Sequence, residues 1–158
     1  EKLTLDGTAH IERNQPDEMA AIHWLRQAPY GVIAEAIGGA YSGYARISVN
    51  TGLPTVLGWD NHESQWRGSR VEIGNRAVDI EQLYVKSDWE SIKAILVKYN
   101  IRYVYLGLLE RNTYSLSQED FVRRMEIFGI YLKPVFISDT VVIYEVPNLE
   151  TTPLQIVP

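Results

Sequence analysis

The densest group of side chains that could do chemistry lies between residues 59 and 67. This stretch holds two of the four tryptophans, Trp59 and Trp66, and one of the three histidines, His62, beside Glu63 and Arg67. An indole ring offers a flat apolar face and one N–H donor, which suits sugar rings and partner surfaces. Aromatic and charged groups gathered in this way are typical of binding sites. A tryptophan pair can equally pack as a loop anchor, so both interpretations stay open for Trp59 and Trp66.

The same stretch does not complete a metal or nucleophile motif. His62-Glu63 begins like the zinc motif His-Glu-x-x-His, but Trp66 stands where the second histidine is required. The chain has no cysteine, which excludes thiolate zinc sites and cysteine nucleophiles. His62 has a side chain whose ordinary pKa, near 6.5, suits acid–base chemistry. Without a nucleophile beside it, a histidine that hydrogen-bonds within its own loop is the favoured interpretation, and we expect no metal.

A second candidate is Glu35, which interrupts the apolar run at 31–37 near its carboxyl end. Ligands of open α/β sheets bind at the carboxyl ends of the strands. A buried carboxylate needs a hydrogen-bonding or charged partner. Arg46 and Arg67 are the candidate partners. Two interpretations are equally supported, namely a ligand-binding role and a Glu–Arg pair that ties the following loop to the sheet.

The loop that follows Glu35 reads Gly38-Gly-Ala-Tyr-Ser-Gly-Tyr44 and carries Tyr41 as a further binding candidate. A phosphate loop needs backbone N–H groups with a helix N-terminus behind them. Neither Gly-x-Gly-x-x-Gly nor Gly-Lys-Ser/Thr is present, and no helix start follows Gly39. We therefore expect no nucleotide cofactor. By strand polarity alone, Glu110 or Arg111 could reach the same edge of the sheet as Glu35.

The elements that must position these residues follow from hydrophobic periodicity and capping signals. Helices are predicted over 17–27, 75–85, 88–99 and from 117 to about 129, and strands over 31–37, 101–106, 131–137 and 140–145. Residues 46–49 could be a short strand or a helical turn, and 54–57 another strand. The helix at 88–99 passes through Asn100 directly into a strand, which is typical of a parallel α/β sheet. Ser138-Asp139 turns the last two strands into a hairpin.

These elements predict a three-layer, Rossmann-like α/β domain with a mixed, mainly parallel sheet and an antiparallel C-terminal edge hairpin. One domain is expected over residues 1–147, with a tail at 148–158. The 158 residues are 46% hydrophobic, enough for one core, and the net charge of −5 argues against a nucleic-acid partner. No run reaches the roughly 18 apolar residues of a membrane span.

Several segments, in this order, resemble the C-terminal region of a family of large polytopic membrane proteins, mostly from Chloroflexi and archaea, named DUF2298 or YYY membrane proteins. The run Thr51-Gly-Leu-Pro-Thr-Val-Leu-Gly-Trp59, followed by His62-Glu63 and Gln65-Trp-Arg-Gly68, is the specific part. The weaker matches are Thr4-Leu-Asp-Gly7, Ala21-Ile-His-Trp-Leu25, Glu35, Tyr41-Ser42, Arg46-Ile-Ser48 and Lys98-Tyr-Asn-Ile-Arg-Tyr-Val-Tyr105. The resemblance covers about residues 3 to 115.

This resemblance implies an extracytoplasmic soluble domain of a cell-membrane protein, whose partner is the membrane-spanning part of the same polypeptide. The family is similar to lipid-phosphosugar-dependent glycosyltransferases of the GT-C type. Those enzymes carry the catalytic acid in their membrane portion, so the isolated chain is expected to have no turnover. The resemblance also implies a lipid-linked sugar or a glycan acceptor as partner. The binding surface would then comprise Glu35, Tyr41, Arg46, Trp59, His62, Glu63, Trp66 and Arg67. The alternative is a structural or protein-interaction domain without a ligand site.

Overall fold

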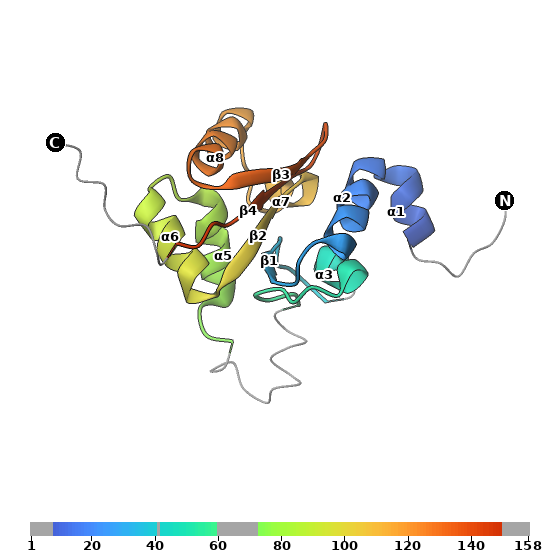
Figure 1. The fold of residues 1–158 in the computed structure, drawn as a ribbon, viewed down its shortest axis with the longest axis horizontal. Coiled ribbons are helices and arrows are strands. Elements are labelled where there is room, and N and C mark those ends of the chain that lie inside the picture. Colours follow the sequence, from blue (N-terminus) through green and yellow to red (C-terminus); the bar gives the residue numbers. More distant parts are fainter. Residues whose placement is uncertain (1–7, 41, 60–72, 150–158) are drawn as a thin grey trace.

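The computed structural model describes residues 8–40, 42–59 and 73–149, and within them a sheet is covered by helices on both faces (Figure 1). The strand order is β1-β2-β4-β3. Strand β1 (Val32–Ala34) runs parallel to β2 (Ile101–Leu106), and β4 (Val142–Glu145) is antiparallel to both β2 and β3 (Lys133–Ile137). The predicted α/β class, the mixed sheet and the C-terminal edge hairpin are confirmed.

The sheet holds less parallel pairing than the sequence predicted. Among the named strand pairs of the described residues, only β1–β2 is parallel. The segment expected to be a strand at 54–57 contributes one parallel bridge, Ile33–Thr55, and Gly38–Trp59 forms a second. These isolated bridges extend the parallel side without adding a full strand. The Pro54 carbonyl also accepts the N–H of Ile33.

Seven helices are described, and four of them lie where the periodicity placed them. These four are α2 (Pro16–Gln27), α5 (Arg76–Val85), α6 (Trp89–Lys98) and α8 (Gln118–Tyr131). The ambiguous segment at 46–49 is helix α3 (Arg46–Thr51). The short helices α1 (Thr8–Asn14) and α7 (Leu108–Thr113) were not predicted. None of the helices in the described ranges is long and apolar enough to cross a membrane.

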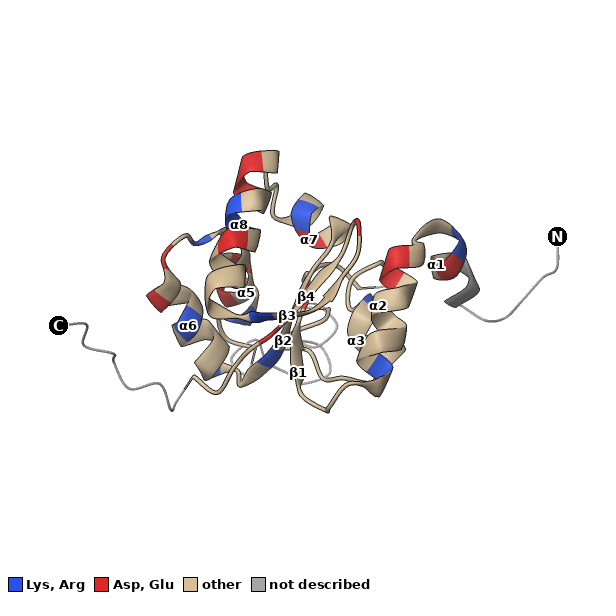
Figure 2. Cartoon of the chain, turned by 45° about the horizontal axis from the view of Figure 1, so that its top comes forward, with Lys and Arg blue, Asp and Glu red and all other residues tan. Residues whose placement is uncertain are grey.

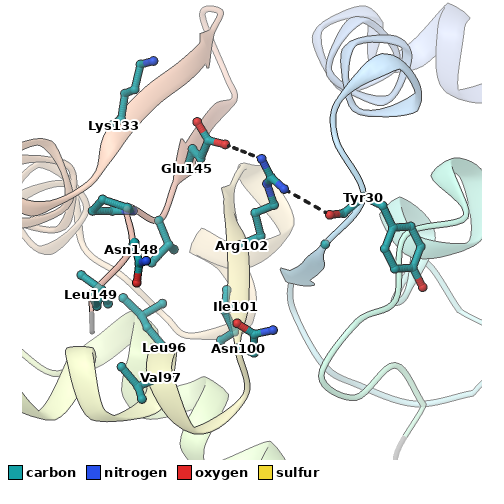
Figure 3. Close-up of a pocket in the computed structure, with 13 residues that line it drawn as sticks. Tyr30, Leu96, Val97, Asn100, Ile101, Arg102, Lys133, Glu145, Asn148 and Leu149 are labelled. Carbon is teal, nitrogen blue, oxygen red and sulfur yellow. Dashed lines mark hydrogen bonds and ion pairs between the residues drawn. The ribbon is translucent and has the colours of Figure 1, made fainter. Parts of the chain in front are cut away.

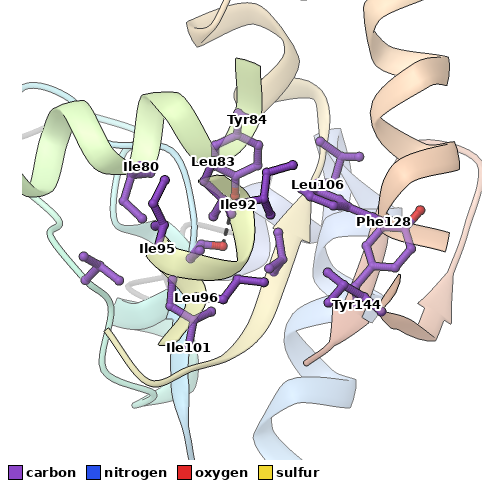
Figure 4. Packing of buried hydrophobic residues seen from close by; sticks show 14 of the residues in the cluster. Ile80, Leu83, Tyr84, Ile92, Ile95, Leu96, Ile101, Leu106, Phe128 and Tyr144 are labelled. Atoms are coloured by element: carbon purple, nitrogen blue, oxygen red, sulfur yellow. Dashed lines mark hydrogen bonds between the residues drawn. The ribbon is translucent and has the colours of Figure 1, made fainter. Parts of the chain in front are cut away.

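Two apolar layers flank the sheet, as a three-layer domain requires. On one face α5, α6 and α8 pack against the sheet through side chains such as Leu83, Ile92 and Phe128 (Figure 4). On the other face α2 and α3 contact Tyr103 and Tyr105. Both tyrosines are fully buried, which confirms that they serve the core. Alternate side chains of β2 therefore point to opposite layers, as the pleat of a strand dictates.

Local capping explains why the unit α6–β2 forms where it does. The Asp88 carboxylate accepts the Ser91 N–H at 2.9 Å and so begins α6. Asn100 lies between α6 and β2, as predicted, and its φ of 49° is in the left-handed region that follows the end of a helix. Asn75, which precedes α5, makes no side-chain capping bond to that helix. The predicted tail at 148–158 lies almost entirely outside the described residues, and the domain boundary stays a prediction.

Acidic and basic residues alternate over the helices in the view of Figure 2, while the sheet between them is mostly uncharged. The charged residues that matter for the candidate site are exceptions to this pattern. They lie inside the molecule, where β1 and β2 end.

Candidate functional site

Four charged side chains converge beside the carboxyl ends of β1 and β2. Glu18 comes from the first turn of α2, Glu35 directly follows β1, Arg46 begins α3 and Glu110 lies in the first turn of α7. The three glutamates are between 0 and 6% exposed. We call these four residues the buried acid cluster. Charged groups are rarely buried unless they are paired, so each must have a defined partner.

Arg46 is the cation of the cluster and contacts two of its acids. Its Nε donates to Glu18 Oε2 at 2.6 Å, and its Nη1 and Nη2 reach the two oxygens of Glu110 at 3.4 Å each. Its guanidinium also lies over the ring of Tyr105, 5.4 Å from the centroid. Burial would lower the pKa of Arg46, but the charges of Glu110 and Glu18 raise it above its ordinary value. The guanidinium therefore remains a fixed positive charge that joins α2, α3 and α7.

Glu110 joins the ends of the two parallel strands. Its carboxylate accepts the N–H of Gly107, after β2, at 3.0 Å and the N–H of Ala36, after β1, at 2.9 Å. The strand-polarity argument that placed Glu110 near Glu35 is consistent with this position. Glu18 was missed by the sequence analysis, because an acid in the first turn of a helix reads as a partner of the helix dipole.

Glu35 is bound differently from the Glu–Arg pair that was one of the two interpretations of the sequence. Its two oxygens accept the backbone N–H groups of Ile47 at 2.9 Å and of Ser48 at 3.0 Å. The ion pairs of Arg46 within the described residues go to Glu18 and Glu110 instead. The physical reason is that Ala45, which directly precedes α3, has a φ of 58° and no side chain that could cap the helix. Glu35 satisfies these N–H groups from across the loop.

The surroundings of Glu35 favour its neutral form. Burial raises the pKa of Glu35 to about 7. The N–H groups of Ser48 and Ile47 and the charge of Arg46 act in the opposite direction, while the charge of Glu110 adds to the increase. Withdrawal from water thus outweighs the favourable contacts of the carboxylate.

Buried tyrosines complete the hydrogen bonding at this edge. The Tyr84 hydroxyl lies 2.6 Å from the Tyr105 carbonyl and 3.1 Å from that of Ala34, so it links β2 to β1. The Tyr114 hydroxyl accepts the Ile37 N–H at 3.2 Å. Burial raises the pKa of Tyr84, Tyr105 and Tyr114 above the ordinary value, so these phenols stay neutral near pH 7.

Trp59 lies at the same end of β1 as the buried acid cluster. It is half-buried, and its indole N–H donates to the Tyr44 carbonyl at 2.9 Å. The Tyr44 hydroxyl in turn accepts from Thr113 in α7 at 3.2 Å. The structure therefore places Glu35, Arg46 and Trp59 at one edge of the sheet. The other predicted binding residues lie outside the described residues, namely Tyr41, His62, Glu63, Trp66 and Arg67.

A cavity of about 680 Å³ lies at the opposite, amino end of β1 and β2 (Figure 3). Arg102 crosses this space and donates to Glu145 at 3.2 Å and to the Tyr30 carbonyl at 3.4 Å. Its charge is thus already matched, and the predicted binding residues that the structure describes, Glu35, Arg46 and Trp59, do not line the cavity. Within the described ranges, no three histidine, aspartate or glutamate side chains are arranged to hold a metal ion.

Comparison with known proteins relates this architecture to one solved domain. No protein-family model and no curated protein matches the sequence. Among solved structures, the fold matches the C-terminal globular domain of an oligosaccharyltransferase from Archaeoglobus fulgidus, with a TM-score of 0.50 and 14% identity. The match covers 93% of this chain and 100% of that one. At this identity the likeness establishes a shared fold, and this chain therefore has the α/β architecture of that globular domain.

Proposed function

We propose that this chain is the extracytoplasmic globular domain of a multi-spanning, glycosyltransferase-like membrane protein of the DUF2298 type. One observation carries the proposal: the fold matches a C-terminal globular domain of an oligosaccharyltransferase over that domain's full length. The sequence resemblance to the C-terminal region of DUF2298 proteins supports the same class independently. The partner of the domain is then the membrane-spanning part of the same polypeptide.

Within that protein, the domain contributes binding or docking rather than the catalytic acid. The acids that the structure describes at the carboxyl edge are withdrawn from solvent and bonded to Arg46 or to backbone N–H groups. A general acid or base must reach the proton that it transfers. The group that transfers protons to a lipid-linked sugar or its acceptor would then belong to the membrane part.

The loop from Trp59 to Arg67 is the surface that we assign to this contact. Trp59 marks its start, at the edge of the sheet where α/β domains bind ligands. Its indole is half-buried, so part of the ring stays accessible. Aromatic and arginine side chains dominate binding energies at protein interfaces, which fits a docking role for this loop.

The alternative is a structural or protein-interaction domain without a ligand site. It is favoured by the internal pairing of the buried acid cluster and by the hydrogen bond from the Trp59 indole to the Tyr44 carbonyl. In that case the loop after Trp59 packs on its own domain, and the cluster only braces the carboxyl edge.

Variants of the full-length protein separate these two functions. We expect Trp59→Ala or Arg67→Ala to reduce the glycan or glycolipid product at least severalfold while the protein still folds and reaches the membrane. Trp89→Ala is the matched control, because Trp89 lies outside this loop. It belongs to α6 and stacks on Tyr131, with 4.1 Å between the ring centroids. Normal product and normal folding in both loop variants would favour the structural alternative.

The isolated chain is expected to lack turnover. Hydrolysis of an activated glycoside or ester well above background would contradict this expectation. The hydrolysis counts as activity of this chain only if it disappears in Glu35→Gln or in a His62 variant.

A further inference from the structure

The cavity of about 680 Å³ at the amino ends of β1 and β2 has the size and the composition of a small-molecule site. Leu96 of α6 and Ile101 of β2, both buried, give it an apolar wall. Asn100, Arg102 and Glu145 line the same cavity with polar groups (Figure 3). Small ligands are held in this way, by apolar contact and by a few fixed polar groups.

Arg102 is fixed in the cavity before any ligand arrives. A Cβ atom at Gly31 would lie 2.5 Å from the Cβ and Cδ atoms of Arg102, so only glycine leaves room for this side chain. The guanidinium lies 5.6 Å from the centroid of the Tyr103 ring and donates to the Tyr30 carbonyl at 3.4 Å. Binding at Arg102 therefore costs little side-chain entropy.

The pairing of Arg102 with Glu145 makes the cavity better suited to an uncharged ligand than to an ion. The two side chains lie 3.2 Å apart and are 39% and 28% exposed, so a ligand can reach both. An anion would be attracted by Arg102 and repelled by Glu145, and the reverse holds for a cation. Lys133 lies opposite Glu145 in the register of β3 and β4, but it is exposed, and water and salt screen its charge.

The same residues keep hydrogen-bonding groups available. Glu145 Oε1 accepts from Arg102, whereas Oε2 has no donor among the residues that the structure describes. The guanidinium has more N–H groups than the acceptors that this part of the chain offers it, which are Glu145, the Tyr30 carbonyl and the Tyr103 hydroxyl. The side-chain amide of Asn100 likewise has no hydrogen bond within the described ranges. Donors and acceptors thus lie side by side, and a hydroxyl is a group that can serve either, because it both donates and accepts.

We propose that this cavity binds a saccharide unit. One hydroxyl of the sugar ring donates to Glu145 Oε2, and its neighbour accepts from Arg102. The C–H face of the ring packs on Leu96 and Ile101. A peptide fits less well, because its N–H only donates and its C=O only accepts, so that each needs its own partner.

This saccharide site is separate from the loop at 59–67. The cavity lies at the amino ends of the strands, whereas Trp59 lies at their carboxyl ends. The inference therefore does not rest on the proposed function, and either one can fail without the other.

NMR titration of the 158-residue chain tests the site. The probes are the methyl glycosides of glucose, mannose, galactose and N-acetylglucosamine, added one at a time. We expect at least one of them to shift the side-chain N–H signals of Asn100 and Arg102 saturably, with a dissociation constant on the order of 1–10 mM. The indole N–H signal of Trp59, at the opposite edge of the sheet, should not move.

Variants of the ion pair separate ligand contact from an effect on folding. Arg102→Met removes the donors and should weaken binding by about tenfold or more. Arg123→Met, which changes an exposed arginine of α8, is the matched control and should bind like the wild type. Glu145→Gln keeps an acceptor oxygen and should bind within about threefold of the wild type, whereas Glu145→Leu should lose binding. The two Glu145 variants decide the matter if Arg102→Met does not fold.

Three results would overturn the proposal. The first is the absence of saturable shifts for every glycoside up to about 100 mM. The second is equal binding by the wild type and Arg102→Met. Inorganic phosphate and N-acetylglycine methylamide serve as anion and peptide probes, and the third result is tighter binding of either one at Asn100 and Arg102.

Discussion

Arg124 is buried and Arg46 is largely buried, yet their surroundings predict opposite effects on stability. Arg46 is the partner of Glu18 and Glu110. Arg124 is 4% exposed, and within the described residues its Nε and Nη1 have no hydrogen-bond partner, while Nη2 donates to the Lys86 carbonyl. Burial lowers the pKa of Arg124 to about 10, against the opposing charge of Asp120. Arg46 thus compensates the charge of two acids, whereas two donor atoms of Arg124 lack an acceptor in the described part of the chain.

Replacing Arg46 should destabilise the domain strongly. Arg46→Met leaves two buried carboxylates without their cation, which costs about 3 kcal/mol or more in the free energy of unfolding. Urea denaturation measures this value. Lys98→Met serves as the control. The Lys98 side chain, which pairs with Asp79, is 54% exposed, and exposed ion pairs contribute little to stability. Equal effects in the two variants would contradict the role assigned to Arg46.

Replacing Arg124 should leave the free energy of unfolding unchanged or raise it. Arg124→Met removes two unsatisfied donors and keeps an apolar chain of similar length over Phe128, whose ring lies 5.3 Å from the guanidinium. The same urea titration applies. A loss of more than about 1 kcal/mol would show that the guanidinium has an essential partner.

At the scale of elements, close packing of side chains on the backbone decides how the loop after β1 is held. Tyr44 lies directly over Gly38, so that a Cβ atom at Gly38 would meet the tyrosine ring at 2.2 Å. A Cβ at the neighbouring Gly39 would meet nothing within 4 Å. Gly38 thus leaves no room for a side chain, whereas the adjacent Gly39 does, although the sequence makes them look alike.

The two glycines provide a matched pair of variants. Gly38→Ala should destabilise the domain by about 1–3 kcal/mol, because the ring of Tyr44 must move away from the loop. Gly39→Ala should change the free energy of unfolding by no more than about 0.5 kcal/mol. Thermal or urea unfolding compares them directly. If the two variants prove equally stable, the close packing of Tyr44 on Gly38 is wrong.

Tyr84 shows the same dependence on contacts between elements. Its hydroxyl lies in α5 and reaches carbonyls of both parallel strands. Tyr84→Phe should cost about 1–3 kcal/mol, since buried carbonyls at the strand ends would lose their donor. Tyr131→Phe, at a largely exposed position of α8, should have little effect on unfolding. A neutral Tyr84→Phe would mean that the hydroxyl does not link β1 and β2.

At the scale of the whole molecule, the titrating groups predict that stability is greatest in mild acid. Glu35 has its pKa raised from 4.5 to about 7, so its contribution is complete below 4.5 and is lost as the pH rises through 7. The pKa values of Asp79, Asp88 and Asp120 are lowered from 3.8, so their contributions are present above 3.8 and are lost in stronger acid. The two trends meet between about pH 4 and 5.

Chemical denaturation between pH 3 and pH 8 checks this profile. We expect the midpoint denaturant concentration to fall from pH 5 to pH 8 in the wild type and to stay nearly level in Glu35→Gln. A wild-type midpoint that rises over this interval would show that Glu35 is stabilised in its ionised form.

The sequence by itself determined the elements whose signals are local. The helix at 17–27, the passage of the next helix through Asn100 and the strand at 101–106 were all correctly predicted, because helix and strand periodicity act over a few residues. The same local signals placed Glu35, Glu110 and the last hairpin. Helices α1 and α7 were missed because each is six or seven residues long, too short to show a periodic pattern.

Only the tertiary structure decided what the buried charges do. Glu18 lies 28 residues from Arg46, and Glu110 lies 64 residues from it, so no spacing rule could pair them. The bond of Glu35 to α3 depends on a loop that returns the chain to the end of β1, whereas the sequence offered Arg46 and Arg67 as candidate partners. The sequence thus fixes which acids stand at the strand ends. Packing of α2, α3 and α7 around those ends removes water and decides which acids pair with Arg46 and which one accepts backbone N–H groups.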